Sequence, residues 1–90
     1  MTTNSSNKKV LLDFYADWCG PCKVQKPIIE KFAKENEIEL KMINVDEYPE
    51  LANKYSVRGI PTIVLEENGT VKTTLYGLQS EANLKKLLNN

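Results

Sequence analysis

The chain has 90 residues, of which 41% are hydrophobic and 27% are charged, the composition of one small globular domain. Its 12 basic and 12 acidic residues cancel to a net charge of zero, which gives no general attraction to nucleic acid or anionic lipid. The sequence contains no apolar run near the ~20 residues of a membrane span and no secretory signal at its polar start. We therefore expect a cytoplasmic protein with no nucleic-acid or membrane partner.

The first part of the sequence predicts a tail, a strand and a helix. Residues 1–8 are polar and predict a flexible tail, which leaves 9–90 as a single domain. The run VLLDFY (10–15) is almost wholly apolar, as in a strand buried on both faces. Residues 20–36 have the apolar spacing of a helix. The stripe expected to face the core consists of Val24, Ile28 and Phe32, with Ile29 and Ala33 beside it.

The remaining sequence predicts three strands and two helices. In chain order they are a strand over 38–45, a helix over 48–55 with Pro49 at its start, a strand over 62–65, a hairpin turn at Asn68-Gly69, a strand over 70–76, and a helix capped by Ser80 with Leu84, Leu87 and Leu88 on one side. The order β-α-β-α-β-β-α begins with a right-handed parallel crossover and then adds an antiparallel hairpin. We expect an α/β fold in which helices flank both faces of a mixed four-stranded sheet.

The two cysteines lie where the first predicted strand gives way to the first helix. Free N–H groups and the positive end of the dipole at a helix N-terminus favour the thiolate, so Cys19 is expected to be nucleophilic. Cys22 is one turn further on, close enough to form a disulfide and expected to be the more shielded of the two. Gly20 allows a tight turn, and Pro21 starts a helix without losing a hydrogen bond.

Three uses of this cysteine pair have to be compared. A structural disulfide here would close a loop of four residues, which is worth only about 2 kcal/mol. A zinc site needs three or four protein ligands, and the chain has no histidine and no third cysteine. Two chains could still share zinc or an iron–sulfur cluster through four thiolates. The sequence favours a working dithiol that needs no metal and no cofactor.

These residues resemble the thioredoxin family. The similarity begins with VLLDFYADWCGPCK (10–23), continues with RGIPT (58–62) and extends through YGLQSEANLKKLL (76–88). It covers nearly all of the chain from residue 10 onward. A CxxC pair alone is a moderate signal, but Trp18 directly before it, together with Ile60-Pro61-Thr62, is highly specific. The resemblance implies a thioredoxin-like fold.

The activity that the resemblance implies is the general reduction of protein disulfides. Cys19 would attack a substrate disulfide, and Cys22 would resolve the mixed disulfide that results. The expected partners are disulfide-containing proteins and a thioredoxin reductase as electron donor, and the chain is expected to act as a monomeric electron carrier. Two alternatives stay open: a glutaredoxin-like role coupled to glutathione, and a binding module that makes little use of the dithiol.

Asp13 matches the buried acid of the family, which is proposed to help deprotonate Cys22. A carboxyl group is unusual within the apolar run VLLDFY. Burial there should raise its pKa towards neutrality, which suits a group that accepts a proton. Many family members carry a lysine near this acid, and Met42 stands at that position here. Lys41 is adjacent in sequence but, one residue off in a strand, should point to the other face.

Four further residues match the surface that surrounds the reactive cysteine in the family. Pro61 corresponds to the family's cis-proline, and Ile60 before it is expected to pair its backbone with an extended substrate. Together with Trp18 and Gly77 these residues would form a shallow apolar patch around Cys19. The chain departs from the family at its front, where a shortened N-terminus leaves no counterpart of the first strand and helix, so four strands are expected in place of five.

Overall fold

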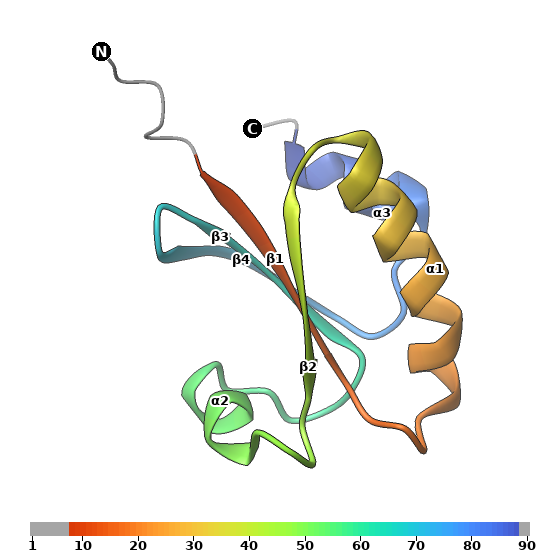
Figure 1. Cartoon of the computed structure of the whole chain (residues 1–90), viewed down its shortest axis with the longest axis vertical. Coiled ribbons are helices and arrows are strands. Elements are labelled where there is room, and N and C mark those ends of the chain that lie inside the picture. Colours follow the sequence, from red (N-terminus) through yellow and green to blue (C-terminus); the bar gives the residue numbers. More distant parts are fainter. Residues whose placement is uncertain (1–7, 89–90) are drawn as a thin grey trace.

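The computed structural model describes residues 8–88 and has the predicted element order, β-α-β-α-β-β-α (Figure 1). The elements are β1 (Lys9–Tyr15), α1 (Gly20–Glu35), β2 (Glu39–Asn44), α2 (Pro49–Lys54), β3 (Thr62–Glu67), β4 (Thr70–Tyr76), α3 (Glu81–Lys85) and a 3-10 turn, η2 (Lys86–Leu88). Residues 1–7 of the predicted tail lie outside the described residues. Lys8 lies within them, and its N–H donates to Asn68 Oδ1 at 3.0 Å.

The four strands form one mixed sheet in the order β2-β1-β3-β4. β1 pairs in parallel with β2, as the crossover through α1 requires, and antiparallel with β3. β3 and β4 form the antiparallel hairpin. The mixed four-stranded sheet expected from the sequence is confirmed. β1, which leads directly into the cysteine pair, is an inner strand.

Helices cover both faces of this sheet, as predicted. α1 and α3 lie together on one face, and α2 lies on the other (Figure 1). Each face has its own core. Leu11 of β1 packs with Phe32 of α1 and Leu84 of α3, whereas Phe14 of β1 packs on the opposite side with Val64 and Tyr55. The alternation of β1 side chains between two apolar layers explains why its sequence is almost continuously apolar.

The predicted stripe on α1 is wrong by part of a turn. Val24 is 52% exposed, and the side chain that takes its place on the buried face is Gln25. The cause is the start of the helix, where Cys22 faces the interior. Residues three and four positions after a buried residue lie on its side of a helix, and the residue two positions after it lies away from that side. The buried face therefore runs through Cys22, Gln25, Ile29, Phe32 and Ala33.

The turn between β3 and β4 and the start of α3 lie where the sequence predicts them, whereas β3 is longer than predicted. Asn68 and Gly69 both have positive φ, 56° and 82°, as a two-residue hairpin turn requires. β3 runs two residues beyond its predicted end, to Glu67, because its ladder with β4 continues up to this turn. Ser80 caps α3 as predicted, with its side chain accepting the N–H of Asn83 at 3.1 Å.

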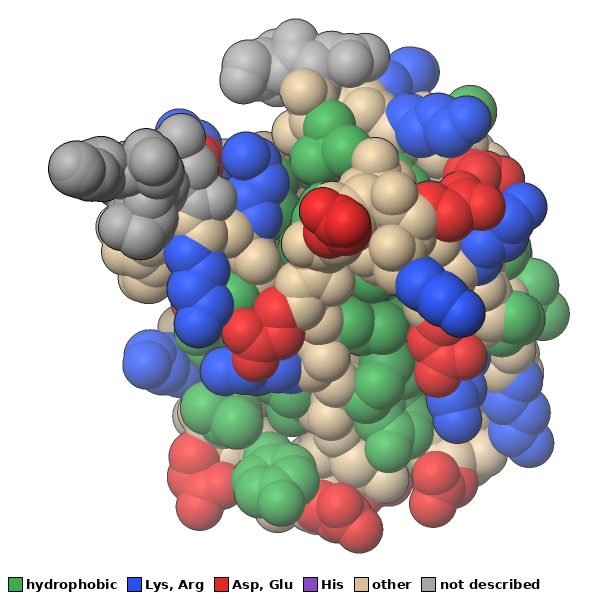
Figure 2. Space-filling model, turned by 45° about the horizontal axis from the view of Figure 1, so that its top comes forward, with side chains coloured by type: hydrophobic (Ala, Val, Ile, Leu, Met, Phe, Trp, Pro, Cys, Tyr) green, Lys and Arg blue, Asp and Glu red, His purple; other side chains and the backbone are tan. Residues whose placement is uncertain are grey.

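On the face shown in Figure 2, basic and acidic side chains lie close to one another, in keeping with the zero net charge.

Candidate active site

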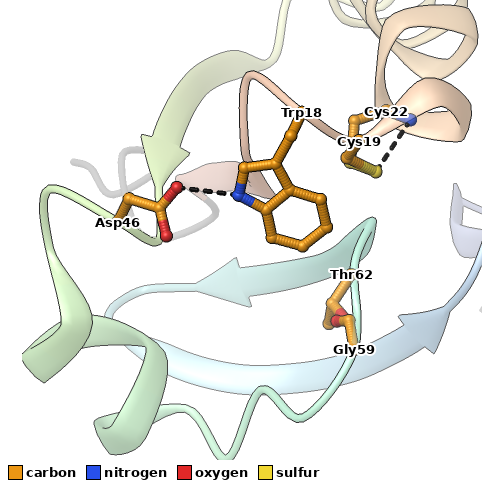
Figure 3. The surroundings of a disulfide bond; sticks show 6 residues. All are labelled: Trp18, Cys19, Cys22, Asp46, Gly59 and Thr62. Atoms are coloured by element: carbon orange, nitrogen blue, oxygen red, sulfur yellow. Dashed lines mark hydrogen bonds between the residues drawn. A yellow bond between two sulfur atoms is a disulfide. The ribbon is translucent and has the colours of Figure 1, made fainter.

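Cys19 and Cys22 form a disulfide at the start of α1, with their Cα atoms 5.3 Å apart. Cys19 is the N-cap residue, and its sulfur accepts the N–H of Cys22 at 3.2 Å (Figure 3). A backbone N–H of the first helical turn thus points at this sulfur, the arrangement that favours a thiolate when the bond is reduced. The two cysteines are almost equally buried, at 4% and 3% exposure, so the expectation that Cys22 is the more shielded is not met.

Trp18 lies directly before the disulfide and is the most exposed large apolar side chain described, at 70%. Its indole N–H donates to Asp46 Oδ2 at 2.9 Å (Figure 3). Asp46 in turn donates its backbone N–H to Asn44 Oδ1 at 2.9 Å. The ring is therefore held beside the cysteines while its face stays open to solvent. Asp46 was not among the predicted site residues. It lies just after β2, at the sheet edge where β1 also ends, and this position is the signal that could have marked it.

The segment before β3 lies against the cysteines. The Ile60–Pro61 peptide bond is cis, as the resemblance implied, and Ile60 packs on the cluster that contains both cysteines. Thr62 Oγ1 donates to the carbonyl of Gly59 at 2.6 Å, which tightens this turn. Gly77, at the end of β4, has φ of +84° and donates its N–H to the carbonyl of Pro61 at 2.8 Å. The positive φ explains why glycine is suited to this position.

An apolar groove of about 350 Å³ runs beside Trp18. Its lining consists of Trp18, Val45, Ala52, Val57, Arg58, Gly59 and Ile60. These residues come from the end of β2, from α2 and from the turn before β3, which are separate in sequence. Of them, only Trp18 and Ile60 were predicted, because nothing in a local pattern marks the others as neighbours.

Asp13 is a fully buried carboxyl group on the face of β1 that α1 covers. It is 0% exposed, and within residues 8–88 neither of its carboxylate oxygens has a hydrogen-bond partner. Burial, and then the negative charge of Glu30, raises the pKa of Asp13 to about 7. Its register partner on β2 is Met42, and Lys41 is exposed on the other side. Met42 thus stands beside the acid, as expected, and the described causes of the shift include no positive charge that offsets the effect of burial.

A second cavity, of about 340 Å³, opens on the other side of the disulfide. Cys22 lines it together with Tyr15, Ala16, Asp17, Lys23, Lys26 and Met42. Cys22 and the neighbour of Asp13 thus share one space. Gly20 and Pro21, by contrast, lie exposed in the first turn of α1. Among residues 8–88 there is no cluster of three or more side chains that could hold a metal ion, and no helix is long and apolar enough to cross a membrane.

Comparisons with known proteins agree with this geometry. The sequence model of the Thioredoxin family matches residues 2–90. Thioredoxin from Rickettsia bellii is 44% identical over 87 residues, which cover 94% of this chain and 83% of that protein. Thioredoxin from Buchnera aphidicola subsp. Baizongia pistaciae is 48% identical over 86 residues, covering 93% of this chain and 79% of that protein.

Solved structures give the same result in three dimensions. A mutant thioredoxin from Halobacterium salinarum superposes with a TM-score of 0.87 at 45% identity, over 94% of this chain and 76% of that one. Thioredoxin from Fasciola hepatica superposes with a TM-score of 0.83 at 36% identity, over 91% of this chain and 79% of that one.

A disulfide that caps a helix and packs against the residue before a cis-proline defines the class of thiol-disulfide oxidoreductases built on this α/β fold. Within that class, the match of the family model to nearly the whole sequence decides between the subgroups. The chain belongs to the thioredoxin family. Its activity is thiol-disulfide exchange, by which it reduces disulfide bonds in proteins.

Proposed function

We propose that this chain reduces protein disulfides with Cys19 as the attacking nucleophile and Cys22 as the resolving thiol. The observation that carries the assignment is that Cys19 caps α1, where its sulfur accepts a backbone N–H. The Cys19 thiolate attacks one sulfur of the substrate disulfide, and the other substrate sulfur leaves as a thiolate that takes up a proton. Cys22 then loses its proton and attacks the Cys19 sulfur. The second substrate thiol is released, and two electrons have passed from the dithiol to the substrate.

Asp13 is proposed as the group that accepts the proton of Cys22. A carboxyl group with a pKa of about 7 is ionised in a large fraction of molecules at neutral pH and can still be protonated there. Met42 is the register partner of Asp13 and also lines the cavity that reaches Cys22. This cavity is the proposed route of the proton, with Met42 between it and the carboxyl group of Asp13, which does not itself line the cavity.

Substrates are proposed to bind on a surface that we call the substrate face, formed by Trp18, Ile60, Pro61 and Gly77 around Cys19, with Gly20 and Pro21 at its border. The exposed indole and the adjacent apolar groove suit extended, apolar protein segments. A shallow apolar surface with few polar groups gives little selectivity, which fits a reductant of many proteins.

The proposed setting is the cytoplasm, where reducing conditions keep most cysteines as thiols. There the chain would act as a monomeric electron carrier and would be reduced again by a thioredoxin reductase. The family match favours this role over the glutaredoxin-like alternative and over a binding module. The order of the two chemical steps and the source of electrons are both open to direct test.

Two cysteine variants test the roles of the two thiols. Cys22→Ser should form a mixed disulfide with a protein substrate through Cys19 and release it slowly, because the resolving thiol is gone. Cys19→Ser should neither turn over nor trap substrate. A Cys19→Ser variant that keeps its biological function would instead identify a binding module. Trapping through Cys22 in that variant would reverse the assignment.

The midpoint potential of the Cys19–Cys22 pair tests the direction of electron flow. Equilibration with a dithiol buffer should give about −270 mV, the value known for thioredoxin itself. A value of about −200 to −230 mV would indicate coupling to glutathione, and about −120 mV would indicate an oxidant. Re-reduction by a thioredoxin reductase, measured in parallel, tests the proposed donor separately from the potential.

A further inference from the structure

Gln25 is a polar residue in the middle of the buried face of α1. It is 0% exposed and lies three residues, almost one helical turn, after Cys22. Its side-chain Nε2 donates to the carbonyl of Gln79 at 3.1 Å, and its Oε1 accepts the N–H of Gln79 at 2.6 Å. One side chain therefore satisfies both backbone polar groups of a residue 54 positions away. Because buried polar groups are stable only with such partners, this pair firmly joins α1 to the segment after β4.

The segment that Gln25 holds belongs to no strand or helix. It spans residues 77–80, between β4 and α3, where backbone bonds are described only at its ends, from the N–H of Gly77 to Pro61 and from the N–H of Leu84 to the carbonyl of Ser80. The side chain of Gln79 supplies others. Its Nε2 donates to the carbonyls of Tyr76 and Gly77 at 3.0 and 3.2 Å, and its Oε1 accepts from Asn83 Nδ2 at 3.2 Å. Gln79 is thus the central point of attachment for the segment.

These hydrogen bonds reach the substrate face. The carbonyl of Gly77 accepts from the Gln79 side chain, and the N–H of Gly77 donates to the carbonyl of Pro61 at 2.8 Å. A continuous series of hydrogen bonds therefore runs from Gln25 through Gln79 and Gly77 to the cis-proline. Its first member is on α1, which begins at the cysteine pair, and its last member directly follows Ile60, which packs on the cluster that contains both cysteines.

We propose that Gln25 is a positioning residue for the docking of protein substrates, which fixes Gly77 and Pro61 relative to Cys19. The proposal rests on the proposed function, in which Gly77 and Pro61 belong to the substrate face. Both described side-chain hydrogen bonds of Gln25 go to Gln79 and neither goes to a sulfur. Loss of the Gln25 amide should therefore disturb the binding of an extended substrate and leave the chemistry of the dithiol unchanged.

The test replaces Gln25 by methionine, which has a similar length and can make neither hydrogen bond. For Gln25→Met we expect the KM for insulin, a disulfide-containing protein, to rise about fivefold with kcat little changed. Substrate binding must then order a segment that Gln25 no longer holds, at a cost similar to that of one net hydrogen bond. The rate with hydroxyethyl disulfide, which is too small to span the substrate face, and the midpoint potential should not change. Hydrogen exchange at the N–H of Gly77 and Gln79 should accelerate about tenfold or more.

Two further variants separate positioning from general stability. Ile29→Val removes buried volume one turn further along the same face of α1 and affects no hydrogen bond of the segment, so it should leave the KM for insulin unchanged. Gln79→Met keeps the backbone groups that bond to Gln25 but loses the bonds to the carbonyls of Tyr76 and Gly77. It should raise KM in the same direction as Gln25→Met, by a smaller factor.

Several outcomes would overturn the proposal. An unchanged KM in folded Gln25→Met would do so, as would an equal KM increase in Ile29→Val. A matching loss with hydroxyethyl disulfide would mean that Gln25 acts on the dithiol itself. If Gln25→Met does not fold, Gln79→Met decides, and an unchanged KM there counts against the proposal. A wild-type chain that fails to reduce insulin would contradict the proposed function. Hydrogen exchange at the N–H of Gly77 and Gln79 in Gln25→Met would still test whether Gln25 holds this segment in place.

Discussion

Asp13 is a buried carboxyl group whose charge the fold does not stabilise. Its pKa is raised from 3.8 in the unfolded chain to about 7 in the folded protein, first by burial and then by Glu30. Between these two values the folded state binds a proton that the unfolded state has lost. Stability therefore falls as the pH rises from about 4 to about 7 and levels off above that. Over this range the group lowers the free energy of unfolding by up to about 4 kcal/mol.

Asp13→Asn removes this dependence, because the amide carries no charge at any pH. We expect the variant to exceed the wild type in stability by up to about 4 kcal/mol at pH 8 and to differ little at pH 3.5. Urea denaturation of the oxidised protein across this range measures the difference. Asp17→Asn is the matched control, because Asp17 is exposed and no such gain is expected there. A constant difference at all pH values would show that Asp13 does not titrate as described.

The residue next to Asp13 allows its pKa to be changed on purpose. Met42 is the register partner of Asp13 and is only half-buried, so a lysine at this position can place an ammonium near the carboxylate. A neighbouring positive charge lowers the pKa of an acid by about 1 unit or more. In Met42→Lys, the acidic limb of the pH profile of kcat/KM for insulin should therefore move about 1 unit lower.

Lys41 provides the control for this experiment. Lys41→Met also alters an ammonium group, but on the opposite face of β2, away from Asp13. This variant should therefore leave the pH profile unchanged. If Lys41→Met moves the profile as far in the opposite direction as Met42→Lys moves it, the shift comes from the overall charge of the protein. An unmoved profile in Met42→Lys would argue that Asp13 is not the base in the reaction.

Among the elements, α1 is the one that begins at the redox pair, with Cys19 as its N-cap. Pro21 lies between the cysteines in its first turn and is exposed, so a substitution there changes the charge near Cys19 without disturbing the core. A protonated histidine at this position stabilises the Cys19 thiolate and hence the reduced form. Pro21→His should therefore raise the midpoint potential by about 30 mV or more, the equivalent of about one unit in the pKa of Cys19.

The effect should depend on the protonation of the histidine. The potential of Pro21→His relative to that of Pro21→Asn, which has a polar but uncharged side chain, should increase as the pH falls through about 6.5. Equilibration with glutathione buffers at several pH values gives both potentials. Equal potentials for the two variants would show that loss of the proline, and not the added charge, is responsible.

The elements also show what the sequence could and could not predict. β1, the Asn68-Gly69 turn and the Ser80 cap depend on neighbouring residues, and their local patterns were sufficient. Gln25 could not be found in this way. An amide on a helix is normally exposed, and the group that makes its burial favourable is 54 residues away. The same holds for the bond from Trp18 to Asp46, 28 residues apart. The cis bond before Pro61 followed from the family resemblance and not from composition.

In the whole molecule, the redox state of the cysteine pair and the stability of the fold are linked by one thermodynamic cycle. The disulfide closes a four-residue loop, which should make the oxidised form about 2 kcal/mol more stable than the reduced form. The cycle requires the same free energy to appear as a difference in potential between the folded and unfolded chains. For a two-electron couple, 2 kcal/mol corresponds to about 40 mV, with the folded pair the stronger reductant.

Urea denaturation of the oxidised and reduced forms measures one side of this cycle, and the potentials in buffer and in concentrated urea measure the other. We expect the two differences to agree and the oxidised form to unfold at the higher urea concentration. A Cys19→Ser/Cys22→Ser variant should unfold at one concentration whether or not dithiol is present. If the reduced form were the more stable one, the folded pair would be a stronger oxidant than the same pair in the unfolded chain. The sign of the stability difference therefore tests whether folding strengthens this pair as a reductant, whereas the midpoint potential itself decides the direction in which the chain transfers electrons.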